Sequence, residues 1–300
     1  MTEDKAVKKI NKKTWILGGI GVFVVLFILV GLFGTPTADY VFKGMNESML
    51  KVKTVTVDQK MTKKGTGDVS LKLYMDLSDS NSLKAKGNFA FGITDSTTPL
   101  EISGDLIKIG DANYVNFTKI GSTDSKISST YSAYQSVLVG KWVKARPNDT
   151  IASFADNALA FASNIIPTPY GNFNDEQRKN LLSIIQDKST YTIEESSQVS
   201  VSGVSAYKYV LTYNKDQYNK FAKSISEYTT IFKKDDTNDK NKVSSYTVWV
   251  NINTKQIIKI EYTGTSPDGD VTGTINFSGY DEKKTVEKPS DYSIESELLN

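Results

Sequence analysis

Hydrophobic positions are distributed very unevenly along this chain, and the longest apolar run comes first. Nineteen uncharged residues, WILGGIGVFVVLFILVGLF, occupy Trp15–Phe33. At about 1.5 Å rise per residue, a helix of this length crosses the ~30 Å hydrocarbon core of a bilayer. The run therefore predicts a transmembrane signal anchor over residues 15–34, with residues 1–14 as a short tail.

The tail indicates which side of the membrane the chain faces. Five lysines precede the apolar run, Lys5, Lys8, Lys9, Lys12 and Lys13. Positive flanks are retained in the cytoplasm, so we expect a single-pass protein of the cell membrane with its N-terminus inside and the remainder extracellular or periplasmic. A cleavable signal peptide is the alternative, but its apolar core usually spans only about 7–15 residues and ends at a small-x-small site.

Beyond the anchor, apolar and polar residues alternate with period two in many segments. The clearest is 69–77, where apolar side chains occupy every second position. Segments 87–91, 114–118, 246–252, 258–262 and 271–277 show the same pattern. Alternation of this kind is typical of antiparallel strands with one buried and one solvated face.

Four segments instead show apolar residues at helical spacing. They are residues 38–52, 151–166, 174–185 and 215–232. The third begins with Asn174, which is a favourable N-cap, followed by two acids in its first turn. Between the last helix and the final strands lies a charged loop without apolar residues, 233–242. The order of elements predicts an α+β fold over residues 38–293, a large antiparallel sheet with helices on a single face, followed by a C-terminal tail at 294–300.

Composition narrows the functions that this chain can perform. It contains no histidine and no cysteine, which excludes Ser-His-Asp and Cys-His catalysis and histidine-based zinc or haem sites. We therefore expect no enzyme, no cofactor and no metal site; acidic turns such as Asp235-Asp236 do not match the calcium-binding loop pattern. The chain holds 36 basic and 34 acidic residues, and five of the bases are in the tail, so nucleic acid is not an expected partner.

Several short patterns resemble one known superfamily. They are Gly104-Asp105-Leu106-Ile107 with Ala112-Asn113-Tyr114-Val115, Gly140-Lys141-Trp142-Val143, Val201-Ser202-Gly203-Val204 before Tyr207-Lys208-Tyr209, and Tyr246-Thr247-Val248-Trp249-Val250-Asn251. With the opening helix and the long meander, they resemble the lipoprotein-carrier superfamily of LolA, LolB, RseB and the mycobacterial LppX/LprG group. The resemblance covers about residues 38–293. It implies a strongly curved sheet, an incomplete barrel, whose apolar concave face is covered by helices. The chain lacks the cysteine that carries the lipid in lipoprotein members, and the transmembrane anchor would replace that lipid.

The resemblance and the alternation together predict an apolar cavity between sheet and helices. We expect its lining to come from Leu71, Leu73, Phe89, Phe91, Val248, Val250, Ile258, Ile260, Ile275 and Phe277. Segments 151–166 and 215–232 are the expected lids. The leading functional hypothesis is a membrane-anchored extracytoplasmic protein that binds lipid or lipoprotein acyl chains as carrier or scaffold. The alternative is an envelope sensor or protein-interaction module, with an envelope protein as partner and no lipid transfer.

Overall fold

The computed structural model describes most of the chain after residue 35. The residues described are 36–65, 67–93, 99–122, 124–145, 168–229, 242–266 and 269–298. The chain divides into two compact units, Met1–Thr37 and Ala38–Asn300. The expected tail, the expected anchor and the expected helix 151–166 lie outside the described residues. Within the described ranges, no helix has the length and apolar character needed to cross a membrane.

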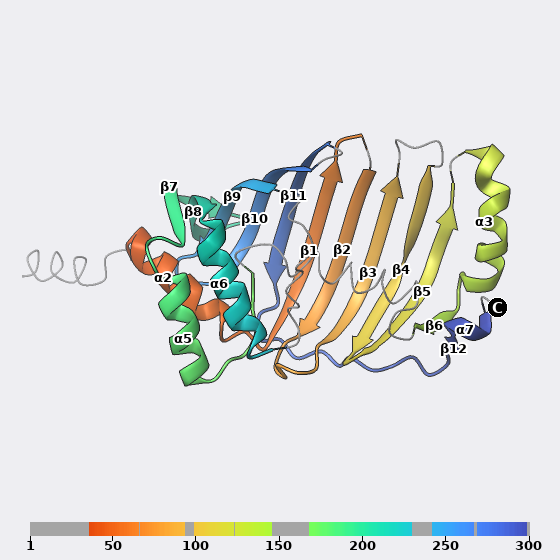
Figure 1. Cartoon of the computed structure of the whole chain (residues 1–300), viewed down its shortest axis with the longest axis horizontal. Helices are drawn as coiled ribbons and strands as arrows, with labels where there is room; N and C mark the ends of the chain where they lie inside the picture. The colour runs from red at the N-terminus through yellow and green to blue at the C-terminus, as the bar shows by residue number, and fades with distance from the viewer. Residues whose placement is uncertain are drawn as a thin grey trace, which may run out of the picture. The chain divides into compact units, whose positions relative to one another are not determined.

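Twelve strands of the second unit form one sheet, in the order β12-β6-β5-β4-β3-β2-β1-β11-β10-β9-β8-β7 (Figure 1). Their bounds are β1 Thr54–Lys63, β2 Gly67–Asp76, β3 Lys84–Ile93, β4 Leu100–Ile109, β5 Ala112–Gly121, β6 Trp142–Ala145, β7 Tyr191–Val201, β8 Val204–Tyr213, β9 Lys242–Asn251, β10 Ile257–Ser266, β11 Gly269–Ser278 and β12 Ser293–Ile294. Every pair is antiparallel except β12 with β6. The predicted large antiparallel sheet is confirmed, and among the described residues it is open, with β12 and β7 at its two edges.

Two meanders from opposite ends of the chain meet at the centre of the sheet. Strands β1 to β5 follow one another as hairpins, and β9 to β11 do the same near the C-terminus. Strand β1 joins them, because Val57 pairs with Leu73 of β2 on one side and with Phe277 of β11 on the other. The sheet is therefore continuous only when residues more than two hundred positions apart have come together.

The alternation in the sequence places apolar side chains on one face of the sheet, the dry face, and polar side chains on the other, the wet face. On β2, Leu71 and Leu73 are buried while Lys72 between them is exposed. The wet face carries polar contacts instead, such as the ammonium group of Lys259 over the ring of Trp249, 4.8 Å from its centroid. The buried face is where helices pack and where an apolar ligand could bind.

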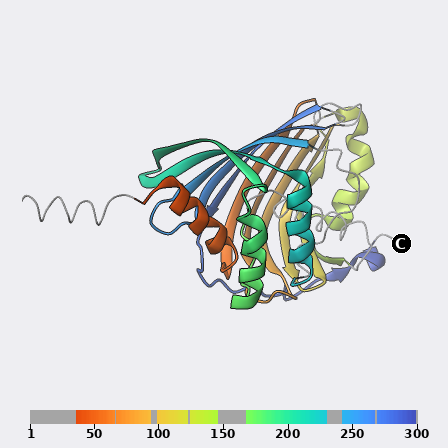
Figure 2. The same ribbon diagram turned by 60° about the vertical axis from the view of Figure 1, so that its left-hand side comes forward.

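Three helices, α2 Ala38–Met49, α5 Asp175–Ile185 and α6 Lys215–Ser226, lie on one face of the sheet toward its β7 end (Figure 1 and Figure 2). Each turns an apolar stripe inward: Phe42 and Met45 from α2, Leu181 from α5 and Phe221 from α6 are at most 1% exposed. Helix α5 begins with a capping box, in which the Asn174 side chain accepts from the Gln177 backbone and Gln177 accepts from Asn174. The expected helices 38–52 and 174–185 are thus present, the first ending at Met49 and the second at Ile185.

The sequence analysis did not predict helix α3, strand β12 or helix α7. Helix α3, Ser125–Leu138, packs beside β5, where the amide of Gln135 donates to the carbonyl of Ile120. Near the C-terminus, β12 pairs with β6 and is followed by the short helix α7, Glu295–Leu298. The segment expected to be a tail from residue 294 is therefore folded against the sheet as far as residue 298.

Candidate ligand-binding face

Nine of the ten predicted lining residues lie on the dry face of the sheet, and Ile258 is the exception. Eight of the nine are at most 5% exposed: Leu71, Leu73, Phe89, Val248, Val250, Ile260, Ile275 and Phe277. The ninth, Phe91, is half-buried, as is Ile258. Whether this face holds a ligand remains a prediction.

Ile258 does not have the position that simple alternation predicts. Strand β10 contains a β-bulge between Ile257 and Lys259, so that Ile257 pairs with Val250 and Lys259 with Trp249. Ile258 is the extra residue, without a cross-strand partner in this ladder. Ile257, which is fully buried, occupies the position expected for Ile258. A bulge inserts one residue into the alternation, which the period-two pattern cannot reveal.

Two adjacent rows of cross-strand partners run over this face. The inner row is Tyr209, Val248, Ile260, Ile275, Gln59, Leu71 and Phe89. The outer row is Tyr246, Tyr262, Gly273, Met61, Val69, Phe91, Ile102 and Ile120. Residues in one row are neighbours across strands, and the two rows are separated by two residues along each strand, about 7 Å.

The outer row is less completely buried than the inner row. Val69, Phe91 and Ile102 are each half-buried, whereas Leu71 and Phe89 of the inner row are at most 3% exposed. A pocket of about 530 Å³ includes Met61 and those three residues in its lining, but its other nine lining residues, such as Ser70, Ser103 and Lys119, alternate with them along the strands. This pocket therefore opens on the wet face of the sheet. The dry face is accessible at the outer row through the partial exposure of Val69, Phe91 and Ile102.

A polar pair interrupts the apolar face at the inner and outer rows. Gln59 is 1% exposed and Tyr262 is 4% exposed, and the Gln59 amide nitrogen donates to the Tyr262 hydroxyl over 3.3 Å. The amide oxygen of Gln59 has no hydrogen-bond partner. Burial raises the pKa of Tyr262, and the hydrogen bond from Gln59 acts in the opposite direction. The sequence analysis did not identify this pair. Its only local sign is that Gln59 is polar in the otherwise apolar alternating series Val55, Val57, Gln59 and Met61.

Gly273 allows Tyr262 to reach Gln59. Tyr262 is on β10 and Gln59 on β1, with β11 between them. A Cβ added to Gly273 of β11 would lie 2.2 Å from Cζ and 2.3 Å from the hydroxyl oxygen of Tyr262. The tyrosine ring therefore crosses β11 directly above this glycine.

A cluster of aromatic side chains lies toward the β7 end, beneath the helices. Tyr213 contacts Tyr246 with ring centroids 5.5 Å apart, and Tyr170 contacts Phe221 at 5.0 Å. Burial, reinforced by neighbouring tyrosines, raises the pKa of Tyr170 and of Tyr213 well above the usual 10.0, and burial raises that of Tyr218 to about 12. These phenols stay neutral at physiological pH, so the cluster contributes no charge to the apolar interior.

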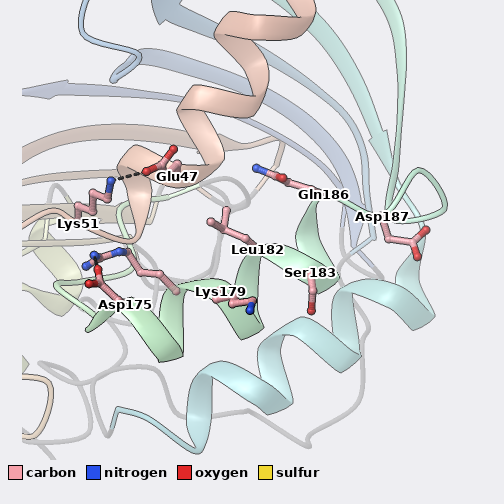
Figure 3. A pocket seen from close by; sticks show the side chains of 9 residues that line it. Glu47, Lys51, Asp175, Lys179, Leu182, Ser183, Gln186 and Asp187 are labelled. Carbon is pink, nitrogen blue, oxygen red and sulfur yellow. Dashed lines mark hydrogen bonds and ion pairs between the residues drawn. The ribbon is translucent and has the colours of Figure 1, made fainter.

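A second pocket, of about 550 Å³, lies between the end of α2 and α5 and is mostly polar (Figure 3). Glu47 forms an ion pair with Lys51, and Asp175 with Arg178. Arg178 also donates to the carbonyl of Phe173. None of the predicted lining residues contributes to this pocket. Among the described residues, no group of three or more acidic side chains is arranged to hold a metal ion.

Comparisons with known proteins give structural neighbours only. No family model and no curated protein matches the sequence. Among solved structures, LprF from Mycobacterium bovis matches with 12% identity and a TM-score of 0.46, covering 86% of this chain and 100% of that one. MucB matches with 8% identity and a TM-score of 0.29, covering 88% of this chain and 62% of MucB. A LolA-superfamily protein from Nitrosomonas europaea matches with 9% identity and a TM-score of 0.23, covering 84% and 98%.

One of these neighbours is a LolA-superfamily protein, the superfamily that the sequence resembles. Identities of at most 12% and TM-scores below 0.5 carry no argument about family, ligand or partner. The proposal for function therefore rests on this chain's own geometry.

Proposed function

We propose that the unit Ala38–Asn300 binds an acyl chain of a lipid or lipoprotein against the apolar face of its sheet. The observation that supports this most directly is the outer row of the dry face. Val69, Phe91 and Ile102 are only half-buried there, although Leu71 and Phe89 of the inner row are at most 3% exposed. Protein interiors are close-packed, whereas the sites that bind small molecules are mostly apolar surfaces that a ligand can reach.

The shape of this row suits an extended chain. Four of its positions, Met61, Val69, Phe91 and Ile102, belong to adjacent strands, β1 to β4. With about 4.8 Å between strands, the row extends about 14 Å across the sheet. An acyl chain lying across the strands would contact all four side chains, and each methylene removed from water would contribute about 0.8 kcal/mol.

The location proposed for this activity is the outer face of the cell membrane. The apolar run Trp15–Phe33 behind five lysines supports a single-pass anchor with its N-terminus in the cytoplasm. Only residues 34–37 separate that run from the start of α2 at Ala38. The binding unit would therefore stay close to the bilayer from which an acyl chain can be taken. The role proposed is binding and transfer without catalysis, in keeping with the lack of histidine and cysteine.

Native mass spectrometry of the exported unit, purified without detergent, tests the binding role. We expect co-purified lipid, and calorimetric titration with a short-chain acyl lipid should show a negative heat-capacity change. Phe91→Asp should remove this binding, because a carboxylate would enter the apolar outer row. Asn88→Asp, on the same strand at an exposed position of the opposite face, is the matched control and should bind normally.

Absence of both co-purified lipid and calorimetric binding would refute the acyl-chain proposal and favour the protein-interaction alternative. The anchor has its own test. Protease added to intact cells should digest residues 38–300 and spare the N-terminal tail. Full protection of the exported unit would refute the proposed orientation.

A further inference from the structure

Two exposed apolar side chains lie at the end of the unit where α2 begins. Tyr40 of α2 is 61% exposed, and Val204 of the β7–β8 hairpin is 38% exposed. Among the described large apolar side chains, only Ile93 and Tyr134 are comparably exposed. Single exposed apolar residues are common on protein surfaces, so what matters is whether these two belong to one surface.

A chain of contacts joins Tyr40 to Val204. The ammonium group of Lys255 lies over the ring of Tyr40, 5.2 Å from its centroid, and it donates to the carbonyl of Ile252 over 2.7 Å. The backbone N–H of Ile252 donates to the carbonyl of Ser205 over 3.1 Å, and Ser205 directly follows Val204. Tyr40, the β9–β10 turn and the tip of the β7–β8 hairpin thus form one surface, which we call the α2-end surface.

The α2-end surface contains polar and basic groups but few acids. Segments 196–215 and 245–260, which include both hairpin turns, hold no aspartate or glutamate. Asp39, the acid beside Tyr40 on α2, forms an ion pair with Lys43 over 2.9 Å. Bilayers that contain anionic lipids have a negative surface potential, so this surface can approach them without repulsion.

Tyrosine and lysine are also side chains typical of a membrane interface. A tyrosine has an apolar ring and a polar hydroxyl, and it is enriched at the level of the lipid head groups. A lysine can lay its methylene stem on apolar surface while its ammonium group reaches water or phosphate. Lys255 beside Tyr40 provides this combination, and Val204 at the hairpin tip adds an aliphatic group.

The length of chain before α2 indicates what lies opposite this surface. Tyr40 follows Phe33, the last residue of the apolar run, by seven positions. A fully extended chain spans at most about 3.6 Å per residue, so Tyr40 is within about 25 Å of the end of that run. A membrane-spanning run would therefore hold the α2-end surface within reach of the lipid head groups. A short tether gives a roughly millimolar effective concentration, so even a weak contact would be populated.

We propose that the α2-end surface docks on the phospholipid bilayer in which the chain is anchored, with Tyr40 and Val204 in the head-group layer. The contact fixes which end of the sheet faces the membrane, since a tether alone would leave the unit free to rotate. This inference rests on the anchor proposed above and is independent of acyl-chain binding.

Fluorescent labelling of the full chain in vesicles of phosphatidylcholine and phosphatidylglycerol tests this docking. The chain contains no cysteine, so each introduced cysteine takes the label at one position only. Ser205→Cys places the label at the exposed hairpin tip, and Ser136→Cys places it at an exposed position of α3. Helix α3 packs beside β5, which is eight strand spacings from β8, about 38 Å along the sheet. A lipid with a nitroxide on its head group should quench the label at residue 205 strongly and the label at residue 136 weakly.

Two substitutions test the side chains themselves. Tyr40→Ser and Val204→Ser should each weaken docking about three- to tenfold, measured as a loss of quenching at residue 205. Both side chains are exposed, so neither change should unfold the protein. Tyr134→Ser, at a ring of α3 that is 50% exposed, is the matched control and should leave the quenching unchanged.

The outcomes separate this proposal from those on which it rests. If the chain enters the vesicles but both labels are quenched equally, or if Tyr40→Ser and Val204→Ser leave the quenching unchanged, the docking surface is refuted while the anchor stands. If the chain does not stay with the vesicles, the anchor fails, and the docking surface fails with it. Acyl-chain binding, which native mass spectrometry tests on the unit alone, is unaffected by either result.

Discussion

The ring of Tyr262 lies directly above Gly273 of the neighbouring strand, where an added Cβ would be 2.2 Å from Cζ. Gly273→Ala should therefore displace the ring and break the hydrogen bond from Gln59. We expect a loss of about 1–3 kcal/mol in the free energy of unfolding, as for other overpacked core positions. Urea denaturation of the variant and the parent protein measures this loss.

Gly92→Ala provides the matched control for that substitution. Gly92 is also a strand glycine, but nothing lies within 4 Å of a Cβ built on it. Alanine there should stay within about 0.5 kcal/mol of the parent protein. Equal losses for the two variants would contradict the close packing of Tyr262 on Gly273.

Adjacent residues at the bulge of β10 should differ sharply in their importance. Ile257 is fully buried opposite Val250, whereas Ile258 is half-buried and without a cross-strand partner. Ile257→Ala should cost about 2–5 kcal/mol, the usual range for a buried isoleucine, and Ile258→Ala clearly less. Chemical denaturation of both variants measures these losses. A larger loss for Ile258→Ala than for Ile257→Ala would mean that the alternation continues without a bulge, as the sequence predicts.

The sequence reveals the strands well because their pattern is local and strict. Leu71 and Leu73 alternate with Lys72, and one buried face is enough to produce that pattern. The bulge at Ile258 and the polar position Gln59 depend on neighbours distant in sequence. Gln59 contacts Tyr262, 203 residues away, so no local pattern could pair them.

Helix α3 was missed for a related reason. Its sequence, SKISSTYSAYQSVL, is rich in serine and β-branched or aromatic residues, which are weak helix formers. Most of its side chains from Ser132 to Ser136 are exposed, so it lacks the broad apolar stripe on which helix prediction depends. Packing beside β5, a tertiary effect, determines this helix.

The two faces of β2 give a direct test of the register. Leu73 is fully buried and pairs with Val57, while Lys72 is exposed. Leu73→Asp should cost several kcal/mol, because it buries a carboxylate without a partner. Lys72→Thr should stay within about 0.5 kcal/mol of the parent. Similar melting temperatures for the two variants would mean that the strand faces are assigned the wrong way round.

The buried tyrosines should make the fold sensitive to alkaline pH. An unfolded tyrosine releases its proton near pH 10, whereas burial raises the pKa of Tyr218 to about 12 in the folded protein. The unfolded state therefore holds fewer protons than the folded state between these values. The contribution of these tyrosines to the free energy of unfolding should be constant below about pH 10 and then fall, by up to about 1.4 kcal/mol per pH unit for each such tyrosine.

Replacing one tyrosine of the cluster tests this origin of the alkaline sensitivity. Tyr218→Phe removes one titrating group, so between pH 10 and 12 the free energy of unfolding should decline less steeply than in the parent protein. Tyr170 and Tyr213, whose pKa values burial also raises, still titrate in the variant, so the decline should be reduced but not abolished. Tyr134→Phe, at a ring that is 50% exposed, is the control and should leave the slope unchanged. Denaturant titrations across this pH range measure the slopes, and identical slopes for Tyr218→Phe and the parent would show that Tyr218 is not buried as described.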